Sequence, residues 1–138
     1  MLKSISSSQE LSVLEAALAG AALRHKVISN NIANVNTPLF KKSEVHFEEQ
    51  LQQLLNDSPE KKLPLTITNE RHLLPKQSPS VPYVTVVGDT SYRTDGNNVD
   101  IDVETANMAK NTIYYDAVAQ QISRYFSDLK SVINEGRS

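Results

Sequence analysis

The sequence predicts a mainly α-helical protein in which long N- and C-terminal helices pair as an antiparallel coiled coil around a small mixed α/β insert. The first observation is the placement of proline, because all six prolines lie between Pro38 and Pro82. Proline breaks helix interiors, so long helices can form only outside that stretch. The second observation is a heptad-like spacing in both proline-free ends. We divide the chain into an N-terminal helical arm (1–37), an insert (38–100) and a C-terminal helical arm (101–138).

The N-terminal arm carries mostly apolar residues spaced alternately by three and four positions, which is typical of the contact line of a coiled coil. Ser7 and Glu10 fit a capping box at its start. Its end is set by Pro38, since the residue before a proline disfavours helix. We call the residues at this spacing the N-terminal seam: Leu11, Leu14, Leu18, Ala21, His25, Ile28, Ile32 and Val35.

The C-terminal arm repeats the spacing over a longer stretch. Asp102 is the predicted N-cap, Glu104 favours the helix dipole in the first turn, and Gly136 is the predicted stop. We expect the best packing toward Leu129, because threonines weaken the start of the line. The C-terminal seam comprises Ile101, Thr105, Met108, Thr112, Tyr115, Ala119, Ile122, Phe126, Leu129 and Ile133.

The insert has shorter elements. Phe47, Leu51, Leu54 and Leu55 predict one amphipathic helix over residues 44–56. Two β-rich runs, residues 63–68 and 81–87, predict short strands, and their prolines confine them to sheet edges or strand starts.

Composition and charge exclude several classes of function. Lys and Arg total 14 against 16 Asp and Glu, a net charge of −2, so the electrostatic footprint of a nucleic-acid-binding protein is absent. The chain has no cysteine, which removes disulfides, thiolate metal sites and cysteine nucleophiles. The N-terminal residues do not fit the pattern of a cleavable signal peptide, and we expect no transmembrane helix. These features fit a cytoplasmic protein or one exported without cleavage.

We expect no metal, no cofactor, no small-molecule substrate and no enzymatic activity. The histidines His25, His46 and His72 have no neighbouring ligand at metal-binding spacing. The acidic stretch 95–104 lacks the twelve-residue spacing of a calcium loop. It is better interpreted as a turn at Asp95 and Gly96 that leads into the C-terminal helix.

Apolar side chains also flank both seams, and a two-helix hairpin cannot bury them alone. Another copy of the chain, or a relative, is the simplest surface to cover them, so we infer an assembly subunit. The residues predicted to form its assembly seam are Leu11, Leu14, Leu18, Ile28, Ile32, Met108, Tyr115, Ile122, Phe126, Leu129 and Ile133.

The first arm ends in an asparagine-rich run, residues 29–38. Asparagine amides can satisfy the last carbonyls of a helix. They can also form a polar contact that sets the register between neighbouring subunits. Both interpretations remain open.

Two motifs resemble a known family, the flagellar basal-body rod and hook proteins. The first is Asn31-Ile32-Ala33-Asn34 followed by Thr37-Pro38. The second runs from Asp95-Gly96-Asn97-Asn98-Val99-Asp100 to Glu104 and, with Arg71-His72-Leu73 and the short insert, resembles the proximal rod branch of that family. Members often have Gly then Tyr after Thr-Pro, whereas this chain has Leu39 and Phe40. Leucine resists positive φ, which argues against a tight glycine-type turn at 39.

The resemblance implies a structural role in the basal body of the bacterial flagellum. Such proteins are exported through the flagellar type III apparatus without signal cleavage and stack helically into the rod that transmits torque for motility. The implied partners are other copies, other rod proteins, the export apparatus and the ring base. The alternatives are a generic cytosolic coiled-coil adaptor or chaperone and a small hydrolase that uses His72.

Overall fold

The computed structural model describes residues 9–56, 82–88, 91 and 93–135. Helix α2 spans Gln9–Ala33, strand β1 Ser43–His46, helix α3 Glu48–Asn56, strand β2 Tyr83–Val86 and helix α4 Ile101–Glu135. The predicted fold class is confirmed: long helices lie at both ends of the chain, and a small strand and helix insert lies between them.

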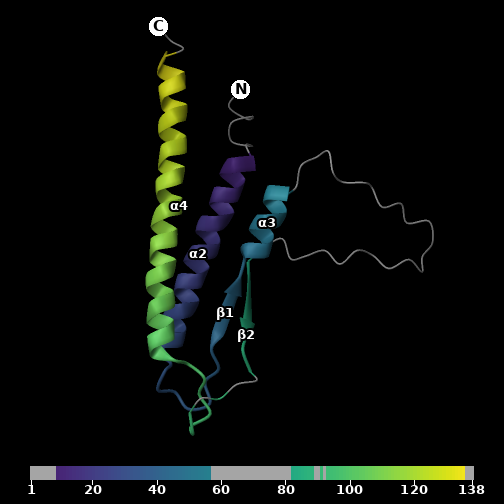
Figure 1. The fold of residues 1–138 in the computed structure, drawn as a ribbon, viewed down its shortest axis with the longest axis vertical. Helices are drawn as coiled ribbons and strands as arrows, with labels where there is room; N and C mark the ends of the chain where they lie inside the picture. Colours follow the sequence, from purple (N-terminus) through teal and green to yellow (C-terminus); the bar gives the residue numbers. More distant parts are fainter. Residues whose placement is uncertain (1–8, 57–81, 89–90, 92, 136–138) are drawn as a thin grey trace, which may run out of the picture.

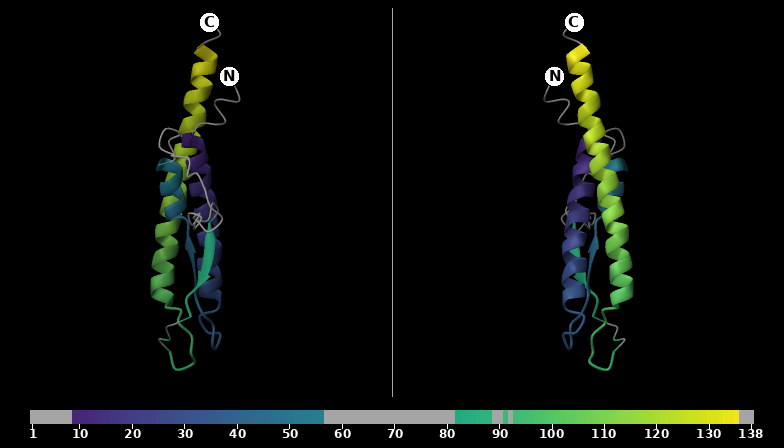
Figure 2. Two further views of the ribbon diagram at one scale, coloured as in Figure 1. Left: turned by 90° about the vertical axis from the view of Figure 1, so that its right-hand side faces the viewer. Right: turned by 90° about the vertical axis from the view of Figure 1, so that its left-hand side faces the viewer.

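The two long helices lie side by side and run in opposite directions (Figures 1 and 2). Their order is fixed by two contacts, because Asn31 near the end of α2 donates a hydrogen bond to Glu104 near the start of α4, and Asn111 donates to the carbonyl of Ala21. Helix α2 is central in the molecule, since α4 packs on one side of it and β1 and α3 pack on the other (Figure 1).

Helix α4 is longer than its partner, with 35 residues against 25. Asn111 faces Ala21, so a step of twelve residues from each reaches Ser123 on α4 and Gln9, the first described residue of α2. Helix α4 continues to Glu135, about 18 Å further at 1.5 Å per residue. We call residues 124–135 the α4 extension; Figure 1 shows it rising past the start of α2.

The insert contains an antiparallel pair of strands, β1 and β2, in which Glu44 lies opposite Thr85 and Val45 opposite Val84. The predicted strand over 81–87 is therefore confirmed as β2. The prediction of helix over 44–56 is wrong at its start, because residues 44–46 belong to β1 and the helix begins at Glu48.

Residues 44–46 form a strand instead of a helix because they pair with β2 and because their burial alternates. Val45 and Phe47 are buried, whereas His46 between them is exposed, which is the period of a strand. The predicted strand over 63–68, the capping Ser7 and the stop at Gly136 lie outside the described residues.

Candidate assembly surface

The two family-like motifs, more than fifty residues apart in sequence, meet at one end of the helix pair. Asn97 is completely buried, and its Nδ2 lies 3.0 Å from the carbonyl oxygen of Asn34, 3.1 Å from that of Val35 and 2.9 Å from that of Thr37. Its Oδ1 accepts a hydrogen bond of 2.7 Å from the backbone N–H of Val99. One side chain thus ties the chain leaving α2 to the chain entering α4.

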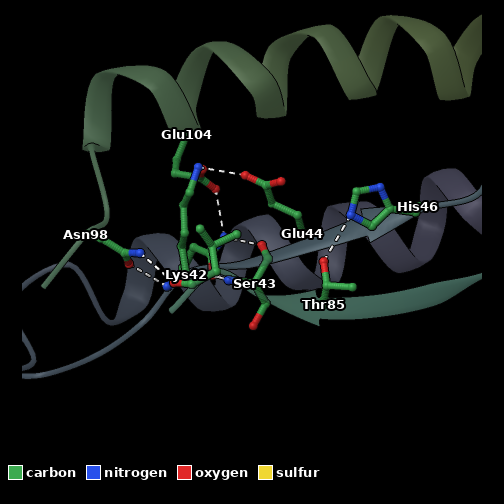
Figure 3. A network of polar contacts seen from close by, with 9 residues as sticks. Lys42, Ser43, Glu44, His46, Thr85, Asn98 and Glu104 are labelled. Atoms are coloured by element: carbon green, nitrogen blue, oxygen red, sulfur yellow. Dashed lines mark hydrogen bonds and ion pairs between the residues drawn. The ribbon is translucent and has the colours of Figure 1, made fainter. Parts of the chain in front are cut away.

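Asn31 makes a second connection at the same end. It is 1% exposed, accepts a hydrogen bond from the Ser43 N–H (3.0 Å), and donates to the Ser43 carbonyl (2.9 Å) and to the Glu104 carboxylate (3.0 Å). Three elements, α2, β1 and α4, are thereby joined through a single amide. Figure 3 shows Glu104 reaching down from α4 toward Ser43, beside the ion pair of Lys42 and Glu44.

Asn98 makes the third connection, between the segments that flank the sheet. Its Oδ1 accepts from the Lys42 N–H at 2.7 Å, and its Nδ2 donates to the Val87 carbonyl at 2.7 Å (Figure 3). We call Asn31, Asn97 and Asn98 together the asparagine corner. Each amide uses both its donor and its acceptor, so burial leaves no orphaned polar group there.

The asparagine-rich end of α2 also satisfies its own last turn. Asn34 donates through Nδ2 to the carbonyl of Asn30 at 2.8 Å, as expected for an amide that ends a helix. Asn31, in the same run, makes its polar contacts with Ser43 and Glu104 of this chain.

The turn at Leu39 differs from the prediction. Leu39 has φ of 61°, in the left-handed region that leucine disfavours. The turn is held because the Leu39 N–H donates to the Asp95 carbonyl at 3.0 Å, and Gly96 opposite has φ of 79°. A Cβ at Gly96 would lie 2.8 Å from the Leu39 side chain. The chain therefore keeps a glycine-type turn with leucine at this position.

The start of α4 also differs in detail from the prediction. The N-cap is Asp100 rather than Asp102, because Asp100 Oδ1 accepts from the N–H groups of Asp102 and Val103. Glu104 is 4% exposed and bound by Asn31, instead of lying in solvent near the helix dipole. Ile101, the first residue of the C-terminal seam, is 46% exposed.

The residues of the predicted assembly seam differ in how far this chain alone buries them. On α2, Leu11 and Ile28 are buried and Leu14, Leu18 and Ile32 are half-buried. On α4, Met108, Ile122 and Leu129 are half-buried, whereas three members remain exposed: Tyr115, Phe126 and Ile133. Whether these residues form an assembly seam between subunits stays a prediction.

The buried residues of α4 are Glu104, Asn111 and Val118, spaced by seven. None of these three belongs to the C-terminal seam, whose half-buried members are Met108, Ala119, Ile122 and Leu129. Two of the three buried residues are polar, which is why apolar spacing missed them. In the described part of the chain the buried residues of α4 all lie in its first half, whereas Leu129, toward which the best packing is expected, is half-buried.

A close contact between α2 and the insert forms the middle of the molecule. Phe47 is 2% exposed and packs against Gly20, Tyr114 is tilted against its ring, and Arg24 lies over its face with the guanidinium carbon 4.4 Å from the centroid. Arg24 also donates to the Val45 carbonyl at 3.0 Å. The absence of a side chain at Gly20 is what lets Phe47 approach.

Arg24 forms an ion pair with Glu48. Burial acts to raise the pKa of the Glu48 carboxyl, but the hydrogen bond from Arg24 and those from backbone N–H groups outweigh it. The pKa therefore lies below its usual 4.5. Burial, assisted by the negative charge of Glu48, raises the pKa of the Tyr114 hydroxyl above its usual 10.0.

A cleft of about 450 Å³ lies between β1 and α4, with Arg24, Glu48, Glu104, Lys110 and Tyr114 among its lining residues. Its charges are of both signs, so it does not select an anion or a cation. Among the described residues, no three His, Asp or Glu side chains are arranged to hold a metal ion. In the same part of the chain, no helix is both long and apolar enough to span a bilayer.

Comparison with known proteins identifies the family. A family model described as flagella basal body rod protein matches residues 11–41. A flagellar basal body rod protein FlgB of Bacillus subtilis is 38% identical over 90% of this chain and 92% of its own length. Proteins of the same name from Borreliella burgdorferi (32% identity; 81% of this chain, 86% of the relative) and Proteus mirabilis (31%; 82% and 85%) are also similar. This chain belongs to the FlgB family of flagellar basal body rod proteins.

Proposed function

We propose that this chain is a structural subunit of the flagellar basal body rod and that it assembles helically through the exposed faces of its terminal helices. The names of its relatives support a place in the rod. The observation that supports assembly through the helices is the α4 extension, where apolar side chains lie on a helix face that the described part of α2 does not reach.

The exposure of the extension is concentrated in a few large side chains. Phe126 is 50% exposed, Val132 68% and Ile133 48%. Phe126, Leu129 and Ile133 follow the three- and four-residue spacing of the C-terminal seam, and Val132 lies three positions after Leu129, so the four residues form one stripe along the helix. Contiguous exposed apolar residues at this spacing are typical of a surface that another chain covers.

Assembly of this kind uses different surfaces on the two contacting subunits. A contact between unlike surfaces that does not close into a ring generates a helix. Many such contacts act in parallel, so torque passes through the whole set of helix contacts rather than through a single residue.

The proposal is tested by charging the stripe. Val132→Asp and Phe126→Asp should express and melt like the parent chain, because both side chains are largely exposed, yet they should prevent rod formation and swimming in a strain that depends on the variant gene. Ser127→Asp is the matched control, since Ser127 is exposed on the opposite side of α4. Normal swimming of both stripe variants would argue against assembly through this face.

Export is a separate part of the proposal. A rod subunit leaves the cytoplasm through the flagellar export apparatus with its N-terminus intact, and its neighbours are other rod proteins and the ring base. A cytosolic adaptor or chaperone would stay inside. Detection of the intact chain in the medium of rod-deficient cells, and its loss when the export apparatus is inactivated, supports the rod subunit. Retention in both strains contradicts it.

A further inference from the structure

Asn111 lies in the contact between α2 and α4 with only half of its amide satisfied. The side chain is 4% exposed, and its Nδ2 donates to the Ala21 carbonyl at 2.9 Å. Its Oδ1 is buried and has no hydrogen-bond partner among the described residues. Turning the amide over does not correct this, because its oxygen would then face the Ala21 carbonyl oxygen.

The contact gives Asn111 no advantage in stability over an apolar residue. The Ala21 carbonyl lies inside α2, where it accepts from the backbone N–H four residues later, so it has a partner without the amide. An orphaned buried acceptor costs more than one hydrogen bond between neutral groups contributes. Stability alone therefore does not account for asparagine at this position.

Apolar spacing leaves the alignment of the two helices open. The buried residues of α4, Glu104, Asn111 and Val118, are spaced by seven, and the same spacing continues at Tyr125 in the α4 extension. If α4 slid by seven residues toward the asparagine corner, Val118 would face Ala21 and Tyr125 would take the present place of Val118. The slide buries an aromatic ring in place of the Glu104 carboxylate, so apolar burial favours it.

Asn111 opposes a slide in either direction because of what α2 presents to it. Ala21 is completely buried and has no side chain beyond Cβ, so the amide reaches the helix backbone there. The residues two turns to either side of Ala21 are Leu14 and Ile28, whose larger side chains would stand between the amide and the backbone. Both halves of the amide would then be buried without partners, which costs more than the one orphaned oxygen of the observed alignment.

The asparagine corner supports the same alignment but does not hold it alone. Its hydrogen bond to α4 runs from Asn31 to Glu104, in the first turn of the helix, and first turns fray. If residues 101–107 unwind, they can form the loop that the slide requires. Asn111 lies about 10 Å further along α4 than Glu104, so it acts on the body of the helix.

We propose that Asn111 is the alignment residue of the α2–α4 pair: it fixes which turn of α4 faces which turn of α2, at a cost in stability. A single buried asparagine sets the register of paired helices in this way. The observed alignment leaves the α4 extension projecting past the described part of α2 (Figure 1), whereas the slide would draw it onto α2. The proposal concerns pairing within one chain, so it goes beyond the proposed function and does not depend on it.

The experiment uses the full chain, which has no native cysteine. Steps of seven residues from Ala21 and from Asn111 bring Leu14 opposite Val118, so Leu14→Cys combined with Val118→Cys reports the observed alignment. Leu14→Cys combined with Tyr125→Cys reports the slide toward the corner. Under mild oxidation of the otherwise unchanged chain, the first pair should form its disulfide much faster than the second.

Asn111→Leu is the discriminating variant, because leucine is of similar size and removes both polar groups. It should raise the linking rate of the second pair about tenfold, since the penalty of one further orphaned polar group corresponds to about that factor in an equilibrium constant. The midpoint of thermal unfolding should stay unchanged or rise. Asn107→Leu makes the same replacement at an exposed position one turn earlier on α4, and should leave both linking rates unchanged.

Two results would overturn the alignment role. One is parental linking of both cysteine pairs in Asn111→Leu, which, with a lower midpoint of thermal unfolding, would identify the bond to Ala21 as purely stabilising. The other is an equal change of linking in Asn107→Leu, which would assign the effect to added apolar surface. Asn111→Ala removes the amide without adding bulk and decides by the same two pairs if the leucine variant loses its circular dichroism signal.

Discussion

The two ends of helix α4 use opposite kinds of surface. Near its start, the asparagine corner buries polar side chains and pairs their donors and acceptors with three other segments of the same chain. In the α4 extension, apolar side chains remain exposed. Hydrogen bonds with fixed geometry therefore define the fold at one end of α4, whereas the other end carries exposed apolar side chains, which are the ones proposed to contact another chain.

This contrast separates stability from assembly. A buried hydrogen bond requires both partners at defined positions, so the corner specifies one relative placement of α2, β1 and α4. An exposed apolar stripe contributes little to the stability of the single chain. Substitutions at the corner should therefore change the free energy of unfolding, whereas those in the extension should change assembly.

The largest expected effect on stability is that of Asn31→Asp. The change keeps the shape of the side chain and the oxygen that accepts from the Ser43 N–H. It removes the amide donor to the Ser43 carbonyl and to the Glu104 carboxylate. It also places a second negative charge where the amide nitrogen lies, 3.0 Å from the Glu104 carboxylate. Loss of partners for buried charge costs about 3–5 kcal/mol. Chemical denaturation should show a loss of that order.

Asn30→Asp is the control for this prediction, because Asn30 is exposed and one position away. It adds the same charge one residue further from the helix end and outside the buried network, so its effect should stay within about 0.5 kcal/mol. Equal losses for the two variants would mean that helix-end charge, rather than the buried network, explains the result.

The sequence predicted the long helices but not the hydrogen bonds of the asparagine corner, and the reason is physical. Proline placement and three–four spacing depend on local backbone preference and on the apolar face, so they predicted α2 and α4. The β-rich composition of residues 81–87, also a local signal, predicted β2. The pairing of Asn97 with carbonyls near residues 34–37 depends on contacts between segments sixty residues apart. No local period encodes such a contact.

Two local errors have related causes. Glu44 and Val45 lie next to an amphipathic helix, and only pairing with β2 makes them a strand. The prediction for Leu39 rests on the intrinsic preference of leucine, whereas the hydrogen bond to Asp95 and the glycine at 96 hold its backbone at positive φ. In both cases tertiary contacts override local preference.

Gly20→Ala tests the middle of the molecule, between the two ends. A Cβ there would lie 2.5 Å from the Phe47 ring. Overpacking costs about 1–3 kcal/mol, which outweighs the gain of about 1 kcal/mol in helix propensity, so thermal unfolding should move to lower temperature. Gly88→Ala is the control, because no atom lies within 4 Å of its added Cβ. Stabilisation by Gly20→Ala would contradict the contact.

Leu39→Gly should have a smaller effect with the opposite sign. Glycine adopts positive φ without the roughly 1 kcal/mol that an L side chain costs there, and the leucine side chain is 76% exposed, so little packing is lost. Greater freedom of the unfolded chain offsets part of the gain. We expect stabilisation of about 0.5 kcal/mol by denaturant unfolding, and a loss of stability would show that the Leu39–Gly96 contact matters more than the backbone.

The smallest effect is a pH dependence at the Arg24–Glu48 pair. Because the folded pKa of Glu48 is below 4.5, the folded state binds this proton less readily than the unfolded state. The contribution is therefore complete above the unfolded value and is lost as pH falls through the folded one. Glu48 is 60% exposed, so solvent screens the pair. Glu48→Gln should lower stability slightly at pH 7 and converge with the parent chain in acid; a gap that stays constant with pH would assign the difference to packing.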